Sequence, residues 1–217
     1  MIDSKNLLIL LLSFIIGSCL TILFLDYENL GFTSTNWLTF YDSKSDFLAL
    51  KFFLNDKWRF PIGLNPNYGD LQNSIVFSGA VPLLSFISKI FKNYLPYNFH
   101  FFSIWIMICF SLQYFFSYKI IHYLTKKTYY SLIAAIFFVI SPILIHRLGI
   151  HLTLSAHWII LAALYLEIFK DQKFLLSKKS FLLIISSLIH FYFTIMLIII
   201  NAVFSVEKLY IKKNFKL

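Results

Sequence analysis

The sequence predicts an all-α protein, a polytopic bundle of transmembrane helices with one long loop on the external side of the membrane. Hydrophobic residues make up 59% of the 217 residues and charged residues only 13%, whereas soluble domains carry about 25% charged residues. Several apolar runs also approach the roughly 20 residues that a membrane-spanning helix needs. The third observation is a polar stretch, residues 26–74, that cannot lie in lipid and holds six of the ten acidic residues. We expect any reactive groups to lie in that stretch.

The first apolar run, residues 7–25, is predicted to be a retained transmembrane helix. It is longer than the hydrophobic core of a signal peptide, and no pair of small residues marks a cleavage site before Asp26. The next run, residues 75–91, contains Gly79 and Pro82 and has lysines at its end. Because it is short and broken, we expect it to be re-entrant or to lie at the membrane interface.

Four further apolar runs follow, and each is predicted to contribute to the membrane-spanning part. They cover residues 99–124, 129–145, 152–169 and 181–206. The last run has His190 at its middle and lysines at both ends. It is therefore either one long tilted helix or two short helices that turn at His190.

The positions of the basic residues decide the predicted topology, because cytoplasmic loops carry an excess of lysine and arginine. The lysine-rich segments fall inside if the N-terminus is inside, residues 75–91 do not cross and the last run is a hairpin. We therefore expect one membrane domain over residues 1–217, with a cytoplasmic N-terminus. Its parts are a first span at 7–25, an external loop at 26–97 with interfacial or re-entrant helices, and the remaining spans at 98–207. This placement explains the net charge of +9, and the lack of a basic helix outside the apolar runs excludes a nucleic-acid partner.

Asp42 and Asp46 are the candidate catalytic residues. Their spacing puts both carboxylates on one face if the segment is helical, and Phe47, Leu50 and Phe53 recur at helical spacing, which predicts an amphipathic helix on the membrane. A carboxylate at the lipid boundary is partly desolvated, which raises its pKa and suits it to act as a general base or to hold a divalent cation. The alternative is that both are solvated loop acids.

The loop that follows is predicted to contact a substrate or acceptor. It contains closely spaced Pro and Gly residues, which set sharp turns, among aromatic and amide side chains. A sugar ring needs such a combination, a flat apolar face together with partners for its hydroxyl groups. The alternative is a turn-rich cap over the helices. The candidate residues are Trp58, Arg59, Asn65, Asn67 and Tyr68.

A second candidate group, His146, Arg147 and His151, lies between two apolar runs. Arginine can bind phosphate bidentately, although an arginine at the membrane boundary can also simply extend toward water. The histidine spacing does not give the i, i+4 pair of a helical metal site. The predicted topology places this group, His190 and the polar loop on the same external face.

Several strings resemble an uncharacterised family of bacterial polytopic membrane proteins, a domain of unknown function. They are DSKSDFLALKFFLNDKWRFPIGLNPNYG, NSIVFSGAVPLLS, SPILIHRLGIHLTLSAHWIILAALYL and LIHFYF. Within them, the patterns W-x-F-P-x-G-x-N-P-x-Y-G and H-R-x-G-x-H carry most of the resemblance. Members look like the N-terminal part of class C (GT-C) glycosyltransferases, which transfer sugars from polyprenyl-phosphate donors on the external membrane face.

This resemblance implies a GT-C-like glycosyltransferase in the bacterial inner membrane, as part of a longer or truncated architecture. Asp42, with Asp46 second, would deprotonate an acceptor hydroxyl or hold a divalent metal ion. Arg147 and His151, with His146, would bind the phosphate of a polyprenyl-phosphate sugar. The loop residues and His190 would hold the acceptor. The implied partners are membrane lipid and the lipid-linked sugar, and neither a definite cofactor nor an oligomeric state follows.

Two other functions fit the same sequence. One is a non-catalytic membrane partner subunit, which the short chain favours. The other is a component of a transporter or flippase for lipid-linked glycans, although such proteins usually show internal repeats and polar residues near the membrane midplane, and the sequence shows neither.

Overall fold

The computed structural model describes residues 4–39, 41–68, 74–169 and 175–214. Every regular element in these residues is a helix, which confirms the all-α prediction. The α-helices are α1 (Ser4–Leu25), α2 (Tyr41–Asn55), α3 (Pro82–Ile90), α4 (Phe102–Thr125), α5 (Thr128–Val139), α6 (Pro142–Ile150), α7 (Trp158–Ile168), α8 (Leu175–Ile189) and α9 (Phe191–Asn214). Short 3-10 helices are Tyr27–Asn29, Asn36–Thr39, Ile75–Phe77, Lys92–Tyr94 and Thr153–Ser155.

Three of these helices are long and apolar enough to cross a membrane: α1, α4 and α9. α5 and α6 meet at a bend of 46° and would form a fourth, broken span if they are counted as one. The run at residues 152–169 differs from the expected span, because its main helix, α7, has only 11 residues. At 1.5 Å per residue such a helix covers about 17 Å, against a hydrocarbon core of about 30 Å.

Residues 75–91 also divide, into the 3-10 helix Ile75–Phe77 and the nine-residue α3. The break lies at Val81, which has a φ of 46° in the left-handed region, immediately before Pro82. A helix this short cannot cross a bilayer, so the prediction that this segment does not span agrees with its length.

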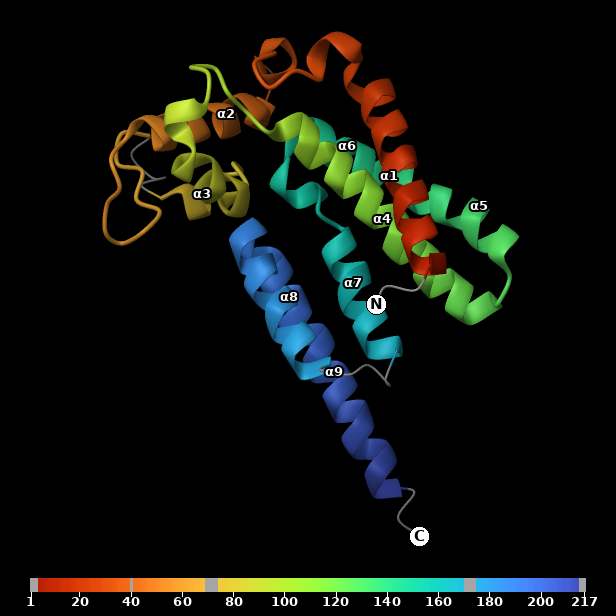
Figure 1. The fold of residues 1–217 in the computed structure, drawn as a ribbon. Helices are drawn as coiled ribbons and strands as arrows, with labels where there is room; N and C mark the ends of the chain where they lie inside the picture. Colours follow the sequence, from red (N-terminus) through yellow and green to blue (C-terminus); the bar gives the residue numbers. More distant parts are fainter. Residues whose placement is uncertain (1–3, 40, 69–73, 170–174, 215–217) are drawn as a thin grey trace.

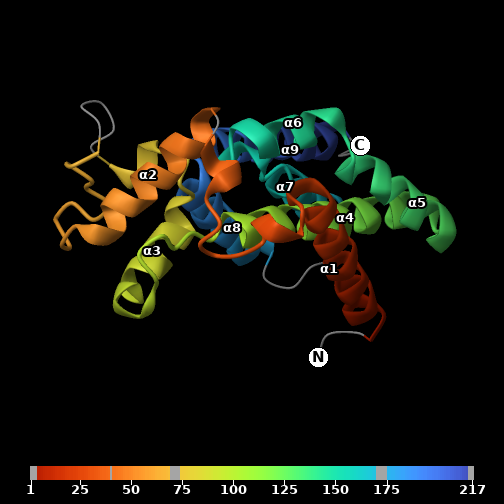
Figure 2. The same ribbon diagram turned by 90° about the horizontal axis from the view of Figure 1, so that it is seen from above.

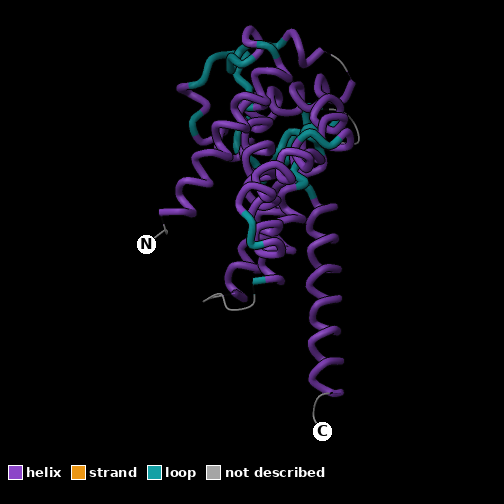
Figure 3. The backbone as a smooth tube through the Cα atoms, turned by 90° about the vertical axis from the view of Figure 1, so that its right-hand side faces the viewer, coloured by secondary structure: helices purple, strands orange, loops and turns teal. Residues whose placement is uncertain are grey.

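The last apolar run forms two helices, α8 and α9, that separate at His190 and pack side by side (Figure 1). Across the turn, the hydroxyl groups of Ser186 and Thr194 lie 3.1 Å apart. The hairpin is therefore the arrangement that these residues adopt. Far from its tip, α9 extends beyond the rest of the molecule (Figure 3).

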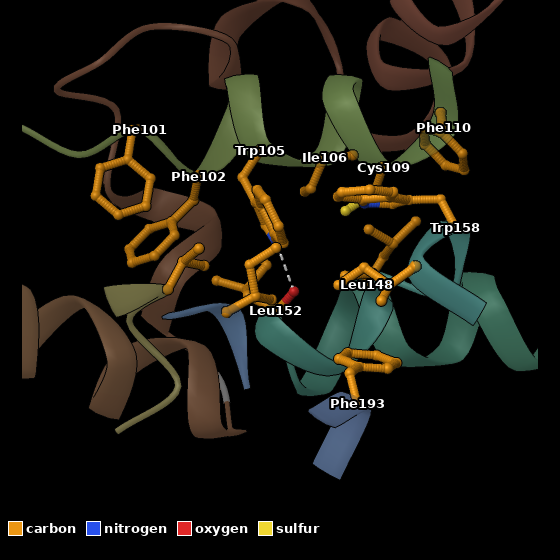
Figure 4. Close-up of a cluster of buried hydrophobic side chains, with 14 of the residues drawn as sticks. Phe101, Phe102, Trp105, Ile106, Cys109, Phe110, Leu148, Leu152, Trp158 and Phe193 are labelled. Atoms are coloured by element: carbon orange, nitrogen blue, oxygen red, sulfur yellow. Dashed lines mark hydrogen bonds between the residues drawn. The ribbon is translucent and has the colours of Figure 1, made fainter. Parts of the chain in front are cut away.

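The core is built around α4, as Figure 4 shows. Phe102, Trp105 and Cys109 on α4 are buried against Leu152 and Trp158. The indole N–H of Trp105 donates to the backbone oxygen of Leu152 over 2.6 Å, so the one polar atom of this large side chain is satisfied inside the core. α1 packs along the other side of α4, where Gly17 allows close approach: a Cβ there would lie 2.0 Å from the Ser111 hydroxyl oxygen.

α2, α3 and their connecting loops gather at one end of the molecule, where α1 ends and α4 begins (Figures 1 and 2). The tip of the α8–α9 hairpin approaches this end from below in Figure 1. The loop after α1 is fixed to the start of α4 by the bond from the Ser103 hydroxyl to the backbone oxygen of Leu30, 3.0 Å. This end carries the candidate site.

Candidate functional site

A polar pocket of about 230 Å³ lies between α2, the turn after α6 and the tip of the α8–α9 hairpin. Four titratable side chains from three separate segments line it: Asp42, Asp46, His151 and His190. Asp42 and Asp46 are one turn apart on α2, as the sequence spacing predicted. The pocket therefore combines two carboxyl groups with two imidazole rings.

Asp46 forms the buried part of the pocket, and only 5% of the residue is exposed. The backbone N–H of Gly79 donates to its carboxyl group, while Oδ2 has no hydrogen-bond partner. Burial raises the pKa of Asp46 from 3.8 to about 8, and the nearby Asp42 contributes to the rise. At neutral pH this side chain is therefore mainly a carboxylic acid, which can donate a hydrogen bond as well as accept one.

Gly79 closes the pocket over Asp46, and no larger residue fits there. A Cβ at this position would lie 2.1 Å from Asp46 Oδ1 and 2.6 Å from its Cγ. The following residues enter α3 through Val81, a β-branched residue held at a φ of 46°. Such conformations cost about 1–3 kcal/mol and occur often at functional sites.

Asp42 and His151 form an ion-pair contact at the mouth of the pocket. His151 Nδ1 lies 2.7 Å from Asp42 Oδ2, with side-chain exposures of 37% and 53%. His151 ends α6, where its backbone N–H donates to the oxygen of Arg147. Because Nδ1 faces a carboxylate, the proton of the neutral ring resides on Nδ1 and the lone pair of Nε2 is free to act as a base.

His190, at the hairpin tip, has the opposite arrangement. Its Nδ1 accepts the backbone N–H of Tyr192 over 3.3 Å, so the proton of the neutral ring lies on Nε2. Burial lowers the pKa of His190, and the neighbouring His151 lowers it further. At neutral pH His190 is therefore an uncharged hydrogen-bond donor.

The described residues also line a larger apolar cavity, of about 580 Å³. It lies between α3, α4, α7 and α8, with side chains such as Leu84, Leu112 and Ile185 in its wall. Ile189 lines this cavity, and the next residue in the sequence, His190, lines the polar pocket.

The other residues that the sequence singled out lie outside the polar pocket. Arg147 is half-buried and His146 is exposed, and neither lines the pocket. Asp42 contacts His151 and not Arg147, because α6 ends at His151 and this side chain reaches α2. Arg59 instead binds Asp56 through two hydrogen bonds, of 2.5 and 3.0 Å.

Two of the five acceptor-loop residues, Asn65 and Tyr68, hold the loop on α2. Asn65 is buried and its amide donates to the backbone oxygen of Ala49, 3.0 Å. The Tyr68 hydroxyl lies 2.5 Å from the Ser45 hydroxyl, and Ser45 itself lines the pocket. Trp58 and Asn67 are exposed. Tyr68 is therefore the one loop residue predicted for substrate binding that contacts a wall of the pocket.

Sequence reasoning missed Gly79, Phe77 and Thr153 as pocket residues. The only signal was the Ser-Gly-Ala-Val-Pro string at residues 78–82, a small-residue segment before a proline. In the described part of the chain, no group of three or more His, Cys, Asp and Glu side chains is placed to hold a metal ion. The carboxyl and imidazole groups that line the pocket are therefore not arranged as such a group.

A comparison of the sequence with protein families assigns the chain to a family. Residues 14–216 match the family described as a domain of unknown function, DUF6311. No curated protein and no solved structure matches the chain. The match covers most of the chain, so this protein belongs to the DUF6311 family.

Proposed function

We propose that this protein is a GT-C-like glycosyltransferase that takes its sugar from a polyprenyl-phosphate donor at the external membrane face. The observation that carries the proposal is the contact between Asp42 and His151 at the mouth of a polar pocket. An acid–imidazole pair is a general base whose ring is oriented by the carboxylate. An apolar cavity lined by Ile189, which precedes His190 in the sequence, supports a donor that carries a long lipid chain.

The proposed reaction begins with the acceptor hydroxyl, which loses its proton to Nε2 of His151. The acceptor oxygen then bonds to the anomeric carbon as the bond from that carbon to the phosphate oxygen breaks. Asp42 stabilises the imidazolium that forms, as the contact at 2.7 Å allows. Polyprenyl phosphate leaves with the electron pair of the broken bond.

Negative charge develops on the departing phosphate, and hydrogen-bond donors aimed at that charge lower the barrier. The Nε2–H of His190 fits this task, since the ring lines the pocket and is uncharged at neutral pH. This donor takes the role that the sequence suggested for Arg147. In this scheme His190 binds the phosphate, while Asp42 and His151 serve the acceptor.

The test is glycan analysis of a strain in which the gene is deleted and complemented with variants. Asp42→Asn and His151→Asn should fail to restore the missing glycan, because each destroys the base. Glu28→Gln, an exposed acid outside the pocket, should restore it fully. Restoration by both pocket variants, at membrane levels equal to wild type, would sink the proposal and favour a non-catalytic partner subunit.

A further inference from the structure

The polar side of α3 faces the protein, and apolar side chains lie on its exposed side. It buries the polar side chains of Ser85, Ser88 and Lys89, whereas Ile87 and Ile90 are 46% and 67% exposed. A helix on a water-soluble surface has its apolar stripe on the inside and its polar residues outside. The reversed pattern is what a helix shows when its outer side lies in an apolar medium.

The buried polar atoms of α3 are satisfied within the protein. The Ser85 hydroxyl donates to the backbone oxygen of Ala80 over 2.5 Å. Lys89 Nζ donates to the backbone oxygen of Lys57 over 3.2 Å and lies 3.9 Å from the centre of the Phe53 ring. The inward polar face is therefore a stable structural arrangement, while the two isoleucines stay largely exposed.

A second segment with exposed apolar side chains, the loop of residues 57–63, contacts α3. It is attached to α3 because Lys89 Nζ lies 5.0 Å from the centre of the Trp58 ring, and because Gly63 packs closely on Phe86. Phe60 and Ile62, at the tip of the loop, are 90% and 67% exposed. Large exposed apolar patches of this kind mark interaction sites.

Charge identifies the occupant of this surface. Two exposed lysines, Lys57 and Lys92, lie in the segments that flank the apolar side chains. The third cation, Arg59, is paired with Asp56, and Lys89 is buried. Amphipathic surfaces with aromatic or aliphatic side chains beside lysine and arginine bind anionic lipid. Three helices among the described residues are long and apolar enough to cross a membrane, so we take the apolar medium to be a lipid bilayer.

We propose that α3 and the 57–63 loop form a membrane anchor, with their isoleucine and aromatic side chains inserted into the bilayer interface. The anchor also binds the phosphodiester headgroups of anionic phospholipids. The anchor is joined to the polar pocket, because Gly79 lies three residues before the start of α3. Insertion of α3 thus holds Gly79 in place over Asp46. The inference rests on burial and charge, and it does not depend on the chemistry proposed for the pocket.

The test measures where Ile90 lies. In a Cys19→Ser/Cys109→Ala background, Ile90→Cys is labelled with the fluorophore NBD and the protein is placed in phosphatidylcholine nanodiscs, with or without phosphatidylglycerol. Lipid carrying a nitroxide on its acyl chain should quench this label strongly and should quench the label on Lys44→Cys, an exposed position on α2, only weakly. Equal quenching at the two positions would overturn the anchor.

The same label tests the choice of lipid. Phosphatidylglycerol should shift the NBD emission further to the blue and increase the quenching, and Lys57→Gln/Lys92→Gln should abolish that gain. Lys127→Gln, an exposed lysine remote from α3, should preserve it. A gain that survives in the double variant would overturn the assignment to anionic headgroups, and a label shielded from both lipid and water would show that a protein surface occupies the site instead.

Discussion

The pH dependence of stability should carry the signature of the buried Asp46. Its pKa rises from 3.8 in the unfolded chain to about 8 in the folded protein. Between these values the folded protein retains a proton that the unfolded chain has lost, so the stability falls as the pH rises. Below pH 3.8 both states are protonated, and above pH 8 both are ionised, so outside this window the contribution is constant.

The magnitude follows from the width of that window. Each pH unit is worth about 1.4 kcal/mol, so the full loss is about 6 kcal/mol. Asp46→Asn keeps an oxygen for the Gly79 N–H and carries no charge. The stability of the variant should match that of the wild type near pH 4. The stability difference in favour of the variant should then grow by about 4 kcal/mol from pH 5 to pH 8. This change corresponds to roughly 10 °C in Tm for a chain of this size.

The assay is thermal unfolding of both proteins in a neutral detergent from pH 5 to pH 9, followed by intrinsic tryptophan fluorescence. Asp42→Asn is the matched control: it removes the neighbouring charge but leaves the burial of Asp46, so the upper end of the window should move to lower pH. A Tm difference between wild type and Asp46→Asn that is constant over this range would refute the reasoning. So would a wild type that is the more stable protein at pH 8.

Three further predictions follow from individual contacts. Gly79→Ala should lower the free energy of unfolding by about 1–3 kcal/mol, because its Cβ would lie 2.1 Å from Asp46 Oδ1. Thermal unfolding should show a smaller loss when the same change is made in an Asp46→Ala background. Equal losses in the two backgrounds would contradict the clash. Glu167→Gln should cost about 3 kcal/mol, because the buried carboxylate pairs with Lys179 and Lys208; an unchanged Tm would show that the α7–α8–α9 contact does not depend on this network. Asp42→Asn should slow sugar transfer about 10²–10⁴-fold with a smaller effect on KM, as judged by initial rates, and a change confined to KM would assign Asp42 to binding alone.

The sequence predicted the parts of the site that depend on local spacing. Asp42 and Asp46 were expected on one helical face, and α2 places both along the same pocket. The charge pattern favoured a hairpin at His190, and the chain does turn there between α8 and α9. Such features are encoded over one or two helical turns, or by the distribution of lysines, and need no knowledge of tertiary packing.

The parts that the sequence did not predict depend on contacts between distant segments. Burial of Asp46 needs Gly79, whose segment folds back through the left-handed Val81. The choice of His151 over Arg147 as the partner of Asp42 depends on where α6 ends, a matter of one turn. The length of α7 was also missed: residues 152–157, which include Thr153, Ser155 and His157, form a turn and a 3-10 helix and are not part of α7.

We propose that Asp42 and His151 catalyse sugar transfer from a polyprenyl-phosphate donor. The most direct measurement uses purified protein in nanodiscs with a panel of polyprenyl-phosphate sugars labelled in the sugar, and follows the release of polyprenyl phosphate together with the labelled product. We predict release by the wild type and by Glu28→Gln, and a loss of at least about 100-fold in His151→Asn. Equal release by the wild type and His151→Asn, from any donor that is turned over, would contradict the account.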